Sequence, residues 1–259
     1  MADRSDRVAR YMAGPSLWSS YEHHAEVVST NDVALQRVGE GGRAGLVVVA
    51  DRQTAGRGRG GRVWQDVPDG NLLVSVATGF PAAGTSLVPL AVGLAVSDAM
   101  RRHGVAAALK WPNDVVVAGR KCAGILVESH DLRPQGPRCL IIGIGVDVDW
   151  RGVDRIDDMA QWTSMAEVTG ADVDRDGLLV DLLRALEAWL LDVPDDPTRL
   201  LAAYRVRCTT LGQQVRVRTV RAEAVGTAVD LDDTGALLVD TRDGRRTVMA
   251  GDVELLRRD

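Results

Sequence analysis

The sequence predicts an α+β protein with a mixed-sheet domain over residues 1–210 and a small antiparallel β-barrel over residues 211–259. Strand-like apolar runs alternate with helical patterns through most of the chain, and four short alternating segments separated by turn residues follow Gly212. The chain has 259 residues, 46% of them hydrophobic, which is enough to bury one large core and a small one.

The chain opens with about 25 residues of weak pattern, which we expect to fray and which are too few to hold a helix-turn-helix domain. Ser29-Thr-Asn-Asp32 then predicts the start of a short helix, because such side chains cap the first backbone N–H groups. The same hydroxyl and amide groups could instead hold a small polar ligand. At this point both interpretations stay open.

A buried strand over Leu46–Ala50 leads into the segment Gln53-Thr-Ala-Gly-Arg-Gly-Arg-Gly-Gly-Arg-Val-Trp64. Its glycines let the backbone approach a ligand closely, and Arg57, Arg59 and Arg62 carry guanidinium groups suited to carboxylate and phosphate oxygens. Trp64 adds an aromatic face. We expect a mobile cationic loop that closes over an anion.

Other interpretations of this loop are weaker. Gly56-x-Gly58-x-x-Gly61 matches the dinucleotide fingerprint, but turn residues follow it where the fingerprint requires a helix. A nucleic-acid-binding RGG segment would be repeated in a basic chain, whereas this one occurs once in a chain of net charge -5. A solvated surface loop stays open until a second motif accompanies it.

A strand over Asn71–Ala77 and a helix over Thr85–His103 follow as ordinary packing elements. Three short strands are then expected: one ending at Lys110, one over Val115–Val117 and one from Lys121 to Glu128.

The second motif is Lys110-Trp-Pro-Asn-Asp114. Pro112 interrupts strand pairing, so Asn113 and Asp114 project at a strand end, with Lys121 on the neighbouring strand. Lys110 and Lys121 are the only lysines in the chain. Ammonium groups, an amide and a carboxylate are what a nucleoside triphosphate with Mg²⁺ requires. A hairpin with a surface ion pair would not explain the Trp-Pro sequence.

After a strand over Arg138–Asp149, residues 151–210 predict helices. A short helix with Trp162, Met165 and Val168 on one face ends at Gly170, a long one is capped by Asp174 and ends at Pro194, and a third begins at Pro197. The strands expected in the barrel are Val215–Val220, Ala224–Val229, Ala236–Val239 and Arg246–Met249.

Composition limits the class of protein. Three widely spaced cysteines form neither a disulfide framework nor a zinc pattern, and the charged N-terminal segment lacks the features of a secretory signal. The longest uncharged apolar run, Thr85–Ser97, is too short to span a bilayer. We therefore expect a soluble cytoplasmic protein with no nucleic-acid or membrane partner.

Four motifs together resemble those of the biotin protein ligase family in order and spacing, over about residues 27–149. They are Ser29–Asn31, Gly56–Gly61, Lys110–Asp114 and Arg120-Lys-Cys-Ala-Gly-Ile-Leu126. The resemblance implies a catalytic domain of the class II aminoacyl-tRNA synthetase/biotin ligase type and an SH3-like C-terminal domain. It also implies that the protein converts biotin and ATP to biotinyl-5'-AMP. The biotin would then pass to a lysine of a biotin carboxyl carrier domain of an acyl-CoA or pyruvate carboxylase.

The resemblance also assigns residues. The biotin site would comprise Ser29, Thr30, Asn31, Gln53, Gly56, Arg57, Arg59, Lys121 and Gly124. The ATP site would comprise Arg57, Arg59, Arg62, Trp64, Lys110, Asn113, Lys121 and Asp147. In catalysis, Lys121, Arg57 and Arg59 would stabilise the reacting carboxylate and α-phosphate, and Asp114 would orient or deprotonate the acceptor lysine. Where this chain has Asp147 the family usually has asparagine; because a carboxylate accepts hydrogen bonds or binds metal, we expect Asp147 to ligate Mg²⁺.

Three other functions stay open. A lipoate or octanoate protein ligase would share the fold and the acyl-transfer chemistry. A biotin-responsive repressor would need a DNA-binding domain, for which too few residues precede Ser29. A non-catalytic biotin-binding protein is suggested by Asp147 alone. The resemblance leaves a homodimer open and does not identify the carrier protein.

Overall fold

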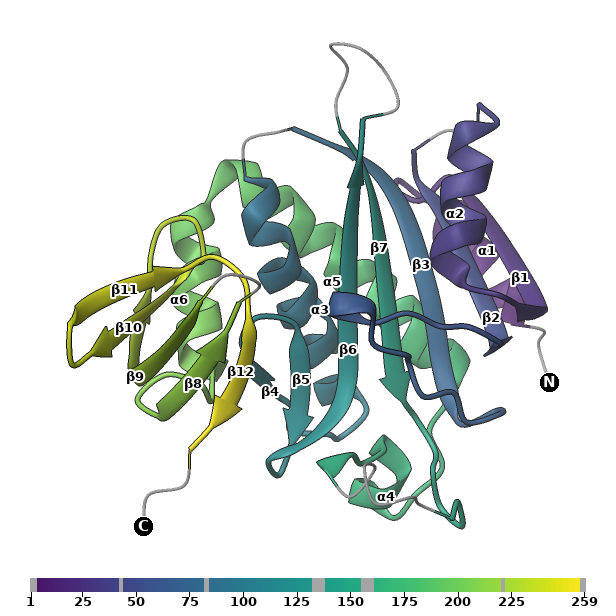
Figure 1. Ribbon diagram of the computed structural model, residues 1–259. Helices are drawn as coiled ribbons and strands as arrows, with labels where there is room; N and C mark the ends of the chain where they lie inside the picture. Colours follow the sequence, from purple (N-terminus) through teal and green to yellow (C-terminus); the bar gives the residue numbers. More distant parts are fainter. Residues whose placement is uncertain are drawn as a thin grey trace.

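A computed structural model describes residues 4–41, 44–81, 84–131, 138–154, 161–219 and 222–256, without the side chains of Arg4 and Ser5. A large mixed sheet lies at the centre of the molecule, and a small antiparallel sheet lies beside it (Figure 1). The predicted α+β class is confirmed.

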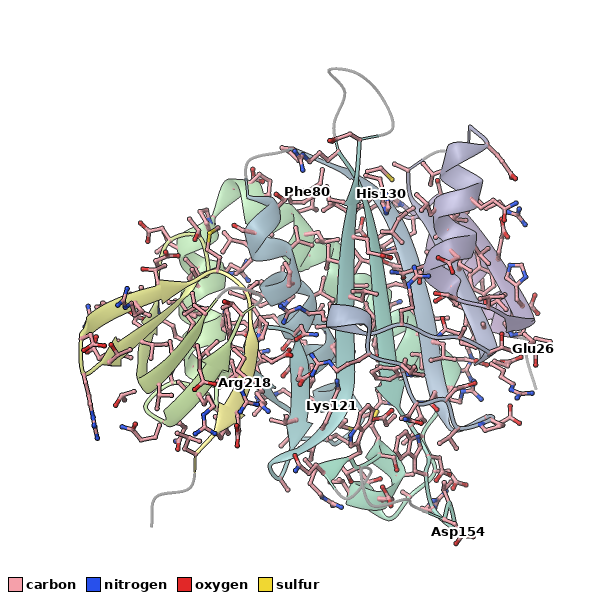
Figure 2. The ribbon with its side chains drawn as sticks, in the orientation of Figure 1. Glu26, Phe80, Lys121, His130, Asp154 and Arg218 are labelled. Carbon is pink, nitrogen blue, oxygen red and sulfur yellow. The ribbon has the colours of Figure 1, made fainter. Side chains whose placement is uncertain are left out.

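The large sheet has seven strands in the order β1-β2-β3-β7-β6-β5-β4. Their bounds are β1 Ser20–Val27, β2 Leu46–Gln53, β3 Asn71–Phe80, β4 Ala108–Lys110, β5 Asp114–Val117, β6 Arg120–His130 and β7 Arg138–Asp147. β1 pairs with β2 in parallel, and every other neighbouring pair is antiparallel. Lys121 and His130 mark the two ends of β6 (Figure 2).

Helices cover both faces of this sheet. They are α1 Arg4–Met12, α2 Thr30–Gly39, α3 Val88–Arg102, α4 Met165–Thr169, α5 Arg175–Asp195 and α6 Pro197–Arg207, with short 3-10 turns η1 Arg59–Gly61 and η2 Thr85–Leu87. α2 lies on one face, and α3 and α5 lie on the other (Figure 1). Side chains along β2 point alternately to the two faces of the sheet. Val47 and Val49 join the core under α3 and α5, whereas Leu46 and Val48 pack with α2.

The small sheet has five strands in the order β11-β10-β9-β8-β12. They are β8 Gln214–Arg218, β9 Glu223–Leu231, β10 Leu237–Thr241, β11 Gly244–Val248 and β12 Asp252–Leu255. Its core is continuous with that of the large sheet. Buried Trp111 joins the two parts, since its indole N–H donates to the carbonyl of Gly235 at 3.0 Å. The expected boundary at residues 210/211 lies in the connection between α6 and β8.

Several expectations about local structure were wrong. The N-terminal residues form α1 and β1, because Val8 and Trp18 are fully buried in the main core. α5 continues past Pro194 to Asp195, since a proline one residue from a helix end removes only a bond of the last turn. Val168 is 39% exposed and does not belong to the buried face of α4. β12 was not predicted.

The observed strand β8 ends at Arg218, and Val220, which was expected to belong to it, lies outside the described residues. No helix within the described ranges is long and apolar enough to cross a membrane.

Candidate active site

Three glycines open the face of the large sheet that carries α2. Gly124 of β6 pairs with Gly145 of β7, and Gly143 lies two residues earlier on the same face. A Cβ on Gly143 would lie 2.4 Å from Oδ1 of Asn31, and one on Gly145 would lie 2.3 Å from the Trp64 ring. Only glycine lets Asn31 and Trp64 approach the sheet this closely, and the result is a hollow above the strands.

The hollow is a cavity of about 280 Å³. The start of α2 forms one end of it, and the Lys110–Asp114 turn with Lys121 forms the other. The loop over residues 56–64 crosses in front of β6, on the face that carries α2 (Figure 1).

The loop is a closed hairpin. The N–H of Gly58 donates to the carbonyl of Arg62 at 2.7 Å, and the N–H of Trp64 donates to the carbonyl of Gly56 at 2.9 Å. Gly60 and Gly61 at its tip have φ of 65° and 76°. These are left-handed conformations that glycine adopts without strain, so the tip can fold back tightly.

Three polar side chains, Thr30, Asn31 and Gln53, line the end of the cavity near α2, and the fully buried Ser75 lies behind them. The hydroxyl of Ser75 lies 2.6 Å from Oδ1 of Asn31 and 2.7 Å from the hydroxyl of Thr30, which in turn lies 2.9 Å from Oε1 of Gln53. The backbone N–H of Thr30 also donates to Oε1 of Gln53 at 2.7 Å. We refer to Thr30, Asn31, Gln53 and Ser75 as the cavity floor.

The hydrogen-bonding contacts within the cavity floor need one more donated hydrogen than its hydroxyl groups supply. Its three oxygen–oxygen contacts share two hydroxyl protons, those of Ser75 and Thr30, because an amide oxygen accepts and never donates. Rotating the Gln53 amide would not help, since its NH₂ group would then face the N–H of Thr30. The floor is therefore matched to a ligand that brings an N–H donor.

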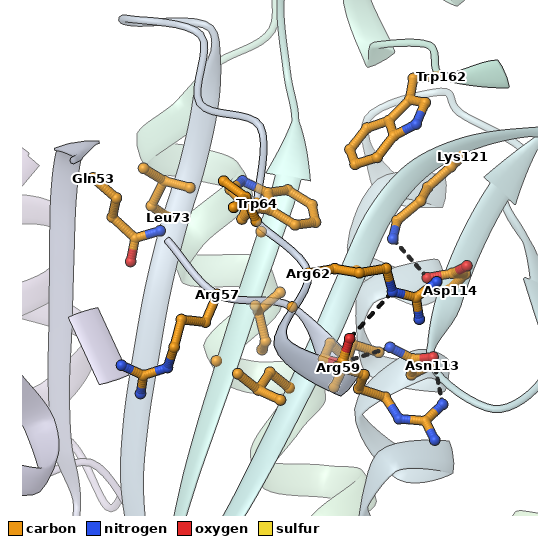
Figure 3. Close-up of a pocket in the computed structure, with 18 of the residues that line it drawn as sticks. Gln53, Arg57, Arg59, Arg62, Trp64, Leu73, Asn113, Asp114, Lys121 and Trp162 are labelled. Atoms are coloured by element: carbon orange, nitrogen blue, oxygen red, sulfur yellow. Dashed lines mark hydrogen bonds and ion pairs between the residues drawn. The ribbon is translucent and has the colours of Figure 1, made fainter. Parts of the chain in front are cut away.

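Arg57 lies on the α2 side of the cavity, away from Lys121 (Figure 3). Its guanidinium pairs with Asp32 at 2.7 Å and lies 3.5 Å from Glu128. The hydrogen bond that Arg57 donates to Asp32 raises the pKa of Arg57, so this side chain is a permanent cation beside the cavity floor.

Arg59 and Arg62 point instead toward the second domain. Arg59 donates to Oδ1 of Asn113 at 3.1 Å and to the carbonyl of Gly251 at 3.4 Å. Arg62 pairs with Asp252 at 2.6 Å. Burial lowers the pKa of Arg59, and the nearby carboxylate of Asp252 opposes that shift. The loop therefore bridges the two domains in its closed form.

Lys121 lies at the opposite end from the floor, in an aromatic setting. Its Nζ atom pairs with Asp114 at 2.8 Å (Figure 3). It also lies 4.9 Å from the ring centre of Trp162 and 5.5 Å from that of Trp64. Trp162 stacks on Trp150 with centroids 5.8 Å apart. These rings can stabilise an ammonium group and offer flat surfaces to a planar ligand.

All but two of the predicted site residues line this cavity. Those that do are Ser29, Thr30, Asn31, Gln53, Arg57, Arg59, Arg62, Trp64, Lys110, Asn113, Asp114, Lys121 and Gly124. Gly56 instead shapes the loop, packed between Gln53 and Trp64.

Asp147 lies apart from the cavity. Its side chain is fully buried at the end of β7, where it accepts a hydrogen bond from the Asn71 amide at 2.9 Å. The expected contacts of Asp147 with ATP and Mg²⁺ do not fit this position. Among the described residues, no cluster of three or more His, Cys, Asp or Glu side chains could hold a metal ion.

Sequence reasoning missed Ser75, which lies behind the cavity lining, and also Gly143, Gly145 and Trp162, which line the cavity. Ser75 is the one polar residue in the apolar run of β3, and Gly143 and Gly145 alternate with isoleucines in β7. Both patterns have the strand period of two and mark one face of the sheet, so they could have been found. Trp162, which lies across the cavity from the floor, had been interpreted as packing.

Comparison with known proteins places these features in context. Residues 25–147 match the biotin/lipoate A/B protein ligase family, and residues 210–256 match the biotin protein ligase C-terminal domain. The biotin–[acetyl-CoA-carboxylase] ligase of Mycobacterium tuberculosis is 36% identical over 251 residues, which cover 93% of this chain and 90% of that protein.

Two further relatives span most of the chain. The bifunctional ligase/repressor BirA of Bacillus subtilis is 31% identical over 90% of this chain and 73% of its own length. The structure of biotin protein ligase from Aquifex aeolicus in complex with biotin and ATP superposes with a TM-score of 0.78 at 29% identity, over 93% of this chain and 100% of the other.

Proposed function

The chain belongs to the biotin protein ligase family, and we propose that it catalyses that family's two steps. In the first, the carboxylate of biotin attacks the α-phosphate of ATP, giving biotinyl-5'-AMP and pyrophosphate. In the second, a lysine amine attacks the acyl carbon of the adenylate, AMP leaves and an amide forms. The acceptor we propose is the biotin carboxyl carrier domain of an acyl-CoA or pyruvate carboxylase.

The shortage of hydrogen-bond donors in the cavity floor is the observation that supports biotin as the substrate. The fused ring system of biotin contains a urea with two N–H donors and one carbonyl acceptor. An N–H group directed at Thr30 or Asn31 supplies the donor that the floor lacks. The dithiolane ring of lipoate has no N–H group and would leave the floor as it is, which favours biotin over the lipoate and octanoate alternatives.

The cations around the cavity suit the first step. A carboxylate and a triphosphate repel each other, and Arg57, Arg59 and Lys121 offset this repulsion as negative charge develops. In our proposal the biotin carboxylate points from the floor toward Lys121, and the indole of Trp64 stacks on the adenine. Lys110, Asn113 and Arg62 then hold the triphosphate.

Mg²⁺ enters this scheme as part of the substrate. It binds chiefly through phosphate oxygens and water, so it needs few protein ligands. Asn113 and Asp114 line the cavity, and their side-chain oxygens are of the type that would bind Mg²⁺ in this scheme.

Asp114 is our candidate for the second step. Its carboxylate holds the ammonium group of Lys121 in the present structure. An acceptor lysine that reaches the adenylate must lose a proton before it attacks, and a carboxylate at this position can orient or accept from it. We also propose a cytoplasmic location, which is supported by the free thiols of Cys122, Cys139 and Cys208.

Biotin-dependent exchange between ATP and pyrophosphate, with lipoate and no-acid controls, tests the proposal. Exchange with biotin and not with lipoate is the expected result. Exchange with lipoate alone would refute the choice of acid. Binding of biotin without any exchange would identify a non-catalytic binding protein. The structure weakens that last alternative, because Asp147, which suggested it, lies outside the cavity.

A further inference from the structure

We propose that Glu128 is a positioning residue for biotin recognition, because its carboxylate fixes the orientation of the Asn31 amide and thereby makes the cavity floor accept hydrogen bonds. The inference rests on the proposed function. Glu128 does not line the cavity; it would act through Asn31.

The geometry around Asn31 leaves its amide one orientation. Nδ2 of Asn31 donates to Oε2 of Glu128 at 2.6 Å, and Oδ1 accepts from the hydroxyl of Ser75 at 2.6 Å. A carboxylate accepts hydrogen bonds only, so the NH₂ end of Asn31 must face Glu128. Asn31 is 4% exposed and is packed so closely on the sheet that a Cβ on Gly143 would lie 2.4 Å from its Oδ1.

This orientation decides what the floor can bind. With Oδ1 toward Ser75, the three oxygen–oxygen contacts share only the two protons of Ser75 and Thr30, so one contact lacks a hydrogen whichever way the hydroxyls rotate. If the amide were reversed, its N–H would donate to Ser75. Ser75 could then donate to Thr30, and the floor would be satisfied without a ligand. Glu128 therefore maintains the need for an external N–H donor.

Glu128 is itself held in place by charge. It lies on β6 on the same face as Gly124, with the Arg57 guanidinium 3.5 Å away. Arg57 has a second and closer carboxylate partner, Asp32, whose carboxylate makes no hydrogen bond with the Asn31 amide in the part of the chain that the structure describes. Asp32 is thus a natural control: it shares the electrostatic environment of Glu128 but not its contact with the amide.

Exchanging the acid and the amide tests the proposal. Asn31→Asp places two carboxylates face to face, and Glu128→Gln permits the Asn31 amide to reverse. Each single variant should weaken biotin binding by about tenfold, the effect expected when one buried polar group is left unpaired. In Asn31→Asp/Glu128→Gln the glutamine donates to the new aspartate, which again accepts from Ser75. This double variant should bind biotin within about threefold of the wild type, because the two changes are directly coupled.

The matched control is Asn31→Asp/Asp32→Asn, which has the same net charge as the exchanged variant. It should bind biotin no better than Asn31→Asp alone, since Asp32 does not set the amide orientation. Isothermal titration with biotin, beside a melting curve for each protein, supplies the readout. Rescue by the exchange and not by the control supports the proposal. An exchanged variant that binds no better than both single variants, or a control that rescues equally, overturns it.

Two further results keep the inference separate from the proposed function. Wild-type protein that neither binds biotin nor exchanges pyrophosphate refutes the function itself, whatever the variants do. Neutron diffraction from wild-type crystals tests the orientation without any substitution. Deuterons on the Asn31 nitrogen that point at Glu128 are expected, and deuterons that point at Ser75 would overturn the proposal.

Discussion

Replacing Gly145 with alanine should displace Trp64 and weaken the use of ATP. The new Cβ would lie 2.3, 2.5 and 2.9 Å from three atoms of the indole, whereas ordinary contacts begin near 3.4 Å. The ring must therefore retreat by about 1 Å, and overpacking of this kind costs about 1–3 kcal/mol in a fixed core. Because Trp64 belongs to a loop and can move outward, we expect a lowering of the melting temperature by only a few degrees.

The loss should appear mainly in the ATP dependence of pyrophosphate exchange. Stacking of a base on an aromatic side chain is worth about 1–3 kcal/mol, so KM for ATP should rise by roughly 5- to 150-fold, with a smaller change in KM for biotin. Gly39→Ala is the control, since a Cβ there meets nothing within 4 Å. A folded Gly145→Ala protein with an unchanged KM for ATP would refute the role given to Trp64.

Three other predictions concern the loop and the far end of the cavity. Asp114→Asn should retain pyrophosphate exchange but slow transfer to a carrier domain by about 100-fold or more, as expected for loss of a general base, and an equal loss in both assays would contradict this. Asp252→Asn should raise KM for ATP less than about fivefold, and the difference from wild type should vanish in 0.5 M salt, because its ion pair with Arg62 is exposed. Hydrogen exchange at residues 56–64 should slow when biotin and ATP are both present, and equal protection in the free and bound protein would count against loop closure.

The sequence was most informative where chemistry and local structure coincide. The Lys110–Asp114 turn and the arginine loop contain residue types that a packed element rarely uses together, and both line the cavity. The segment Ser29–Asp32 predicted the helix that starts at Thr30, although its N-cap residue Ser29 makes no side-chain capping bond. Local residue types therefore predicted where the helix begins, but not that Thr30 and Asn31 would bind side chains of the sheet.

The pairing of strands that are far apart in sequence could not be predicted from local sequence patterns. The position of β7 between β3 and β6 brings Ser75, Gly143 and Glu128 to one face of the sheet, although they are far apart in sequence. Nothing in the local pattern of Glu128 distinguishes it from an exposed strand residue. Asp147 illustrates the same limit. The family's usual asparagine at this position suggested a ligand contact, but in the fold the carboxylate of Asp147 accepts a hydrogen bond from the Asn71 amide.

The two domains meet at the arginines of the loop, and the type of contact there bears on how the loop works. The second domain offers Arg59 a backbone carbonyl and offers Arg62 a carboxylate, which are oxygen acceptors like those of a phosphate. These contacts hold both guanidinium groups in place, so less conformational entropy would be lost if phosphate oxygens replaced them. The small domain would then assist catalysis by preparing the loop, without contributing a reactive group of its own.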